Sequence, residues 1–129
     1  MLAYAAQGVA DDRESSAGSQ LRELLSRAVS AASGLPEAYA ATVVALGVGP
    51  EQPYKDFLNV LHADTTKALA AMRLVLAQPR ISSQLVDNLN ASLHVRMLLT
   101  DVFLLDEVLR PHLQSEQSTQ PMVADSPLT

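Results

Sequence analysis

The chain has 129 residues, the length of one domain, and a domain of this size buries about two thirds of the surface that its unfolded chain exposes. Its many leucines and alanines and its 4% aromatic content favour helix over sheet, and the absence of cysteine excludes disulfides, thiolate catalysis and cysteine-bound zinc or iron–sulfur sites. The net charge of −5 makes the chain acidic, without the basic footprint of a nucleic-acid-binding protein.

The N-terminal segment predicts neither a secretory signal sequence nor a membrane span. It lacks a basic stretch ahead of an apolar one, and we find no apolar run near the ~18 residues that a membrane span requires. Residues 1–18 end in a polar, serine-rich stretch without helical periodicity, so we expect a flexible leader there. Because cysteine is also absent, we expect a soluble, cytoplasmic protein with no membrane span.

Two short helices are predicted next. Apolar residues at helical spacing begin after Ser19, which can cap a helix, and Gly34 ends that helix. Pro36 suits the first turn of a second helix, which the small apolar residues that follow extend to Gly47. The segment 48–53 contains two prolines and separates this short pair from a longer pair.

The longer pair covers about 53–77 and 80–110. The first of these helices has an apolar seam at alternating spacings of four and three: Tyr54, Leu58, Leu61, Thr65, Ala68, Met72 and Val75. The short connection around Pro79 makes the two helices antiparallel neighbours. We therefore predict an all-α fold, a long antiparallel helical hairpin with two shorter N-terminal helices, forming an irregular four-helix bundle in one domain at 19–113. We expect Pro111 to end or kink the last helix and residues 114–129 to be a disordered tail.

The predicted helix 80–110 has more apolar surface than one side of a helix needs, and we expect the fold to be organised around it. On a helical wheel, four apolar residues fall within about 60°, and we call them the Leu93 arc: Leu93, Met97, Leu104 and Val108. Five others form a second arc, the Val95 arc: Val95, Leu98, Val102, Leu105 and Leu109. Two apolar arcs require two packing partners, so we predict that the Val95 arc is an interaction surface for another subunit or protein.

Polar residues fall at one level of the predicted hairpin. Folding it about Pro79 puts His62 roughly opposite Arg96, and we expect a buried polar layer formed by His62, Thr65, His94 and Asp101. Histidines and carboxylates on facing helices form metal sites in bundles. Here His94 and Asp101 are ~10 Å apart along the helix axis, too far to share one metal ion. We therefore predict a structural layer with no metal or cofactor, and keep a metal- or small-molecule-binding bundle as an alternative.

A degenerate histidine phosphotransfer domain is a further alternative. Such domains are four-helix bundles of similar length that resemble one another around His-x-x-Lys-Gly on an exposed helix face. Here His62 is followed by Lys67 two places later than in that pattern, and the glycine is missing.

No catalytic residues are predicted. The serines lack the turn that exposes a nucleophile, and no glycine-rich phosphate-binding loop is present in the sequence. We expect a non-enzymatic helical module that interacts with a protein partner or with itself, as a self-assembling or hetero-oligomeric subunit, an adaptor or a chaperone-like component of a larger assembly.

Overall fold

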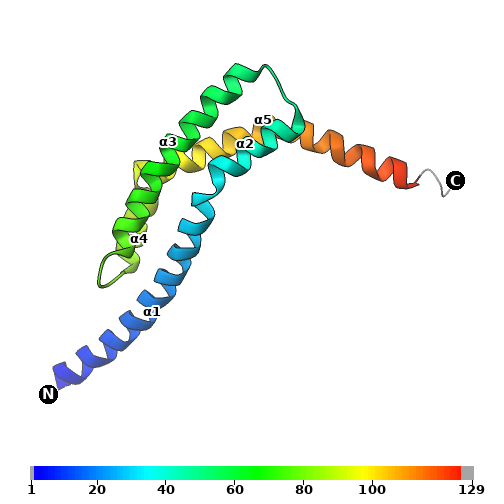
Figure 1. Ribbon diagram of the computed structural model, residues 1–129. Coiled ribbons are helices and arrows are strands. Elements are labelled where there is room, and N and C mark those ends of the chain that lie inside the picture. Colours follow the sequence, from blue (N-terminus) through cyan, green and yellow to red (C-terminus); the bar gives the residue numbers. More distant parts are fainter. Residues whose placement is uncertain (1, 126–129) are drawn as a thin grey trace.

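The computed structural model describes the backbone of residues 2–125 and the side chains of residues 16–114. The described backbone forms five helices and no strand, which confirms the predicted all-α fold (Figure 1). In chain order the helices are α1 (Leu2–Ser33), α2 (Leu35–Leu46), α3 (Glu51–Leu76), α4 (Ser83–Ala91) and α5 (Leu93–Asp125).

Several helix ends follow from local chemistry. Gly47 ends α2 in the left-handed conformation, with φ of 63°, which glycine adopts without the steric cost of a Cβ. The Ser82 hydroxyl caps α4 by accepting a hydrogen bond from the Leu85 backbone N–H at 3.1 Å. The end of α2 at Gly47 and the end of α3 just before Gln78–Pro79 lie where the sequence predicts them.

The predicted helix 80–110 is instead two helices that meet at Ser92. The backbone of Ser92 is extended, with ψ of 146°, and its hydroxyl accepts a hydrogen bond from the Val95 N–H at 3.4 Å. Serine competes in this way for backbone donors, so it favours the start of a helix over its interior. The structure also extends the outer helices: α1 begins at Leu2, and α5 continues past Pro111. An end at Pro111 is therefore excluded, while the division of the chain at residues 18 and 113 stays a prediction.

Helix α3, and not the predicted helix 80–110, is the centre of the fold. It packs against α1, α2, α4 and α5, whereas the described parts of α1 and α5 do not meet. Figure 1 shows α3 and α5 running in opposite directions beside one another. The buried residues of α3 follow the seam predicted for it, with Leu69 and Asp64 added: Leu61, Asp64, Thr65, Ala68, Leu69, Met72 and Val75.

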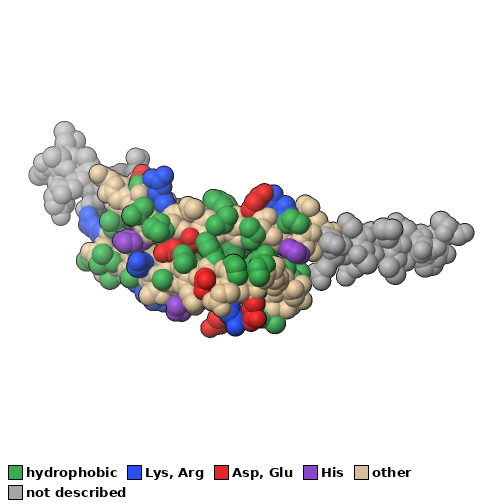
Figure 2. All heavy atoms as spheres, turned by 90° about the horizontal axis from the view of Figure 1, so that it is seen from above, with side chains coloured by type: hydrophobic (Ala, Val, Ile, Leu, Met, Phe, Trp, Pro, Cys, Tyr) green, Lys and Arg blue, Asp and Glu red, His purple; other side chains and the backbone are tan. Residues whose placement is uncertain are grey.

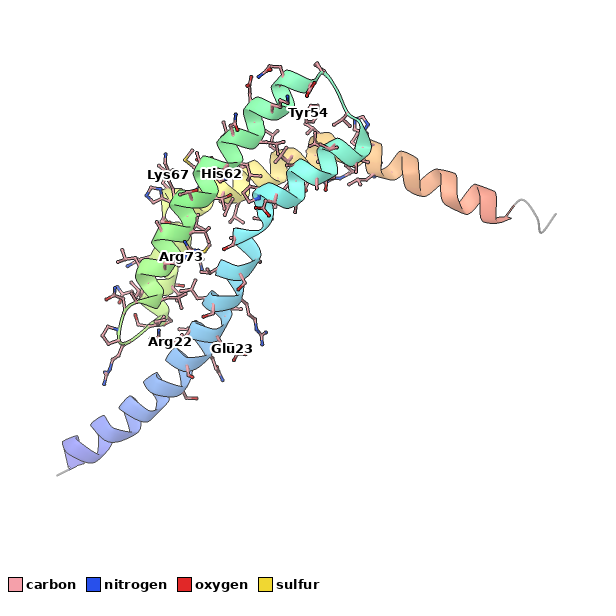
Figure 3. All side chains as sticks on the ribbon, in the orientation of Figure 1. Arg22, Glu23, Tyr54, His62, Lys67 and Arg73 are labelled. Carbon is pink, nitrogen blue, oxygen red and sulfur yellow. The ribbon has the colours of Figure 1, made fainter. Side chains whose placement is uncertain are left out.

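Arg22 fastens α1 to the end of α3. Its guanidinium donates hydrogen bonds to the Leu76 carbonyl at 2.6 Å and to the Gln78 carbonyl at 2.8 Å. Carbonyls at the end of a helix have no partner within it and carry partial negative charge, so a cation stabilises them. Figure 3 shows Arg22 on α1 near the connection that follows α3. This contact holds α1 against the C-terminal end of α3, and the described parts of α1 and α5 do not meet.

Candidate functional site

The structure places the Val95 arc inside the protein. Leu98, Leu105 and Leu109 are almost completely buried, Val95 is buried, and Val102 is partly buried against them. The prediction that this arc is an interaction surface is therefore corrected. These side chains belong to the core of the same chain, in which α5 contacts α2, α3 and α4.

The Leu93 arc remains uncovered by the described residues. The exposed fractions are 68% for Leu93, 42% for Met97, 49% for Leu104 and 41% for Val108. Leu99 and Phe103 are also exposed, on another side of the same helix. Figure 2 shows hydrophobic side chains reaching the surface over the middle of the packed helices. Single exposed leucines are ordinary, but a row of four over four turns is typical of a surface that binds a partner.

A groove adjoins the Leu93 arc. It has a volume of about 290 Å³ and is lined by Pro53, Tyr54, Phe57, Leu104, Leu105 and Val108. Helix α3 supplies one wall through its first turns, and α5 supplies the other. Its lining is apolar except for the tyrosine, so it suits an aliphatic side chain better than a charged or catalytic group.

The predicted polar layer is only partly present. Thr65 and Asp101 are buried, as expected, but His62 and His94 are exposed. His62 and Lys67 lie on α3 in Figure 3. Within the described residues, no group of three or more histidines, cysteines or carboxylates is close enough to hold a metal ion. The histidines therefore do not join Asp101 in one site in this structure.

The buried partner of Asp101 is Asp64, which the sequence reasoning did not include in the layer. Their exposed fractions are only 6% for Asp64 and 7% for Asp101, and an Oδ2 atom of each has no hydrogen-bond partner. Burial and the neighbouring Asp64 carboxyl raise the pKa of Asp101 from its ordinary 3.8 to about 7. Two carboxylates this close cannot both be charged without a large cost, so the pair holds one proton below about pH 7.

The position of this pair also corrects the register of the predicted hairpin. Asp64 of α3 faces Asp101 of α5, whereas folding about Pro79 puts His62 near Arg96. The observed pairing is shifted along α5 by about two helical turns. The shift arises because α4 and the break at Ser92 lie between the two long helices. Asp64 comes three positions after Leu61 and four before Ala68, which places it on the apolar face of α3, and this spacing is the signal that points to the pair.

A second carboxylate ties α2 to α5. The Tyr39 hydroxyl donates a hydrogen bond to Asp106 Oδ1 at 2.6 Å. Burial, together with this hydrogen bond and the Asp106 charge, raises the pKa of Tyr39 above its usual range. The phenol therefore stays protonated and keeps donating at every physiological pH. Asp101 and Asp106 thus flank the Val95 arc, one facing α3 and the other facing α2.

Helix α2 contributes further exposed apolar surface. None of its residues is buried, and Val44 is exposed. By length and composition alone, the stretch Ser16–Leu46 is apolar enough to cross a membrane, and little of it is buried. This finding corrects the expectation that no stretch of the chain reaches that length. Signal sequences and core helices of soluble proteins pass the same test, so the absence of a span stays a prediction.

Comparison of the chain with protein family models, curated proteins and solved structures finds no match.

Proposed function

We propose that this protein is a non-enzymatic helical interaction module that binds a protein surface through the Leu93 arc of α5. The observation that carries the proposal is the contrast between the two arcs of one helix. The Val95 arc is buried by the chain itself, whereas the Leu93 arc and the adjoining groove are uncovered by the described residues.

Removing apolar surface from water contributes ~25 cal/mol per Å² toward binding, against which the loss of translational, rotational and side-chain freedom counts. The exposed part of the Leu93 arc is a ready source of this stabilisation, and Leu104 and Val108 also form one wall of the groove. A helix with an apolar face fits such a row of side chains, because its own side chains interdigitate at the same spacing.

The arc is also fixed in position before any partner binds. The opposite side of α5 is anchored by Leu98, Leu105 and Leu109 in the core and by the Tyr39–Asp106 hydrogen bond. A surface presented by a rigid element loses less conformational entropy on binding than a mobile one. This supports an adaptor or subunit role, and the lack of cysteine supports action in a reducing compartment, which we propose is the cytoplasm.

Site-specific photo-cross-linking in cells that naturally make this protein tests the proposal. A photoreactive residue at Leu104 should give a covalent product with a protein, either another chain or a second copy. The matched control is Leu24 of α1, which is similarly exposed and lies outside the arc, and it should not give that product. A product with lipid alone at Leu104, or no product there, contradicts the proposal.

A further inference from the structure

The intervals between the four residues of the Leu93 arc are the same whether they are taken forwards or backwards along α5. Leu93 and Met97 are four positions apart, Met97 and Leu104 are seven apart, and Leu104 and Val108 are again four apart. If a second α5 lies antiparallel on this face, Leu93 is opposite Val108 of the second copy, and Met97 is opposite Leu104 of the second copy. The two-fold axis then passes between Thr100 and Asp101, and every apolar residue of the arc meets another.

Charged residues beside the arc are also complementary in an antiparallel pair. Arg96 and Glu107 are both exposed and lie on one side of the arc, only about 20° apart on a helical wheel. In an antiparallel pair related by a two-fold axis, the same side of each helix faces its own equivalent. Arg96 therefore faces Glu107 of the second copy, and the symmetry repeats this pair of opposite charges. A parallel arrangement would not bring these two positions together.

In this pairing, the groove beside the arc can receive the Leu93 side chain of the second copy. Leu93 is at the beginning of α5 and is the most exposed member of the arc. In the antiparallel pairing, Leu93 of the second copy lies opposite Val108, which lines the groove together with Phe57. The groove is apolar and has a volume of about 290 Å³, which is ample for an aliphatic side chain.

From the symmetric spacing, the charge complementarity and the groove, we infer that the Leu93 arc binds the same arc of a second copy of this chain, in an antiparallel two-fold dimer. This inference rests on the proposed function and specifies its partner. It makes the interface isologous, so each residue of the arc is used twice and the assembly closes at two chains.

Sedimentation of the purified full-length chain at increasing concentration is the first test. We expect the wild-type mass to rise to that of a dimer, and Met97→Glu to abolish the dimer because the charge would be buried against Leu104 of the second copy. Leu99→Glu is the control, since Leu99 is 49% exposed, against 42% for Met97, and lies on another side of α5. Circular dichroism of each variant verifies that the helices are intact. A wild-type chain that stays monomeric overturns the inference, as does a Leu99→Glu variant that dissociates as readily as Met97→Glu.

Charge exchange tests the direction of pairing. Arg96→Glu alone places two glutamates opposite each other, and Glu107→Arg alone places two arginines opposite each other, so each variant should dimerise several-fold more weakly than the wild type. A mixture of the two variants restores opposite charges at both places and should dimerise more tightly than either variant alone. A mixture no tighter than its components overturns the antiparallel pairing.

Disulfide cross-linking provides a geometric test in a chain without cysteine. Oxidised Thr100→Cys should form a covalent dimer, because this position lies beside the two-fold axis. Leu93→Cys should not, because the two cysteines would be about 22 Å apart along the axis, whereas mixed with Val108→Cys it should cross-link. A covalent dimer of Leu93→Cys alone overturns the inference. If the wild type is monomeric but the Leu104 photoproduct contains a different protein, the dimer is rejected and the proposed function stands; if that photoproduct is also missing, both fail.

Discussion

The two arcs of α5 are similar in residue type but lie in opposite environments. Leu105 of the Val95 arc is almost completely buried, whereas its neighbour Leu104 in the Leu93 arc is about half exposed. The difference comes from the central position of α3, which contacts all four other helices, whereas the core that α2, α3 and α4 form with α5 contains Leu105 and leaves Leu104 at its edge. An apolar side chain therefore stabilises the fold on one arc and remains available for binding on the other.

We expect the largest change in the free energy of unfolding when these two leucines are each replaced by alanine and compared. Leu105→Ala should lower the free energy of unfolding by about 2–5 kcal/mol, because it leaves a cavity in the core. Leu104→Ala should lower it by less than about 1 kcal/mol when measured in dilute, monomeric protein. Urea denaturation measures both. Equal losses for the two variants would contradict the assignment of the arcs.

The sequence predicts that α5 has two apolar arcs, but it does not predict which one is buried. Both arcs have the spacing of a packing face, and the choice between them depends on where the neighbouring helices approach. That approach is set by contacts distant in sequence, such as the bonds from Arg22 to the carbonyls of Leu76 and Gln78. Local rules predict the helix end at Gly47 correctly, because the left-handed backbone there depends on one residue.

The polar residues illustrate the same limit. Thr65 and Asp101 are predicted to be buried and are: Thr65 belongs to the apolar seam of α3, and Asp101 lies between the two apolar arcs of α5. The burial of the histidines is predicted wrongly: His94 lies in the first turn of α5, beside the break at Ser92 that the prediction did not include, and it is exposed. His62 precedes Asp64 by two positions, so its side chain leaves α3 about 160° away from that of Asp64, which faces α5.

We expect the free energy of unfolding to depend on pH, because Asp101 lies beside the Val95 arc where α5 faces α3. The raised pKa of Asp101, about 7 in the folded chain against 3.8, means that the folded state holds this proton more tightly than the unfolded state. The stabilisation from this proton is therefore fully present below about pH 4 and is lost as the pH rises to about 7. Asp101→Asn removes this loss, so at about pH 8 it should be more stable than the wild type by about 1–2 kcal/mol.

Thermal unfolding of the wild type and Asp101→Asn across this range measures the effect. The control is Asp87→Asn, an exposed carboxylate on α4. A difference between wild type and Asp101→Asn that does not change between about pH 4 and pH 8 would contradict a proton shared by Asp64 and Asp101.

Removing the contact between α2 and α5 beside the Val95 arc should change the free energy of unfolding by less than the Leu105 and Asp101 substitutions do. Tyr39→Phe removes the hydrogen bond to Asp106 but keeps the ring, so we expect a loss of about 1 kcal/mol in the free energy of unfolding. Asp106→Asn should cost less, because the amide oxygen still accepts the hydrogen bond from the tyrosine. In the double variant, the two losses should not add, since both act on one contact. Additive losses would show that Tyr39 stabilises α2 in another way.

Two methionines allow the central claim to be measured in the unmodified chain. Met97 lies in the Leu93 arc and is exposed, whereas Met72 is buried in α3. Oxidation by peroxide, followed residue by residue with mass spectrometry, reports access to each sulfur atom. We predict fast oxidation of Met97 and slow oxidation of Met72 in dilute protein, with Met97 becoming protected as the concentration rises. If Met97 is as protected as Met72 even in the most dilute solution, the Leu93 arc is covered by the chain itself and the account is contradicted.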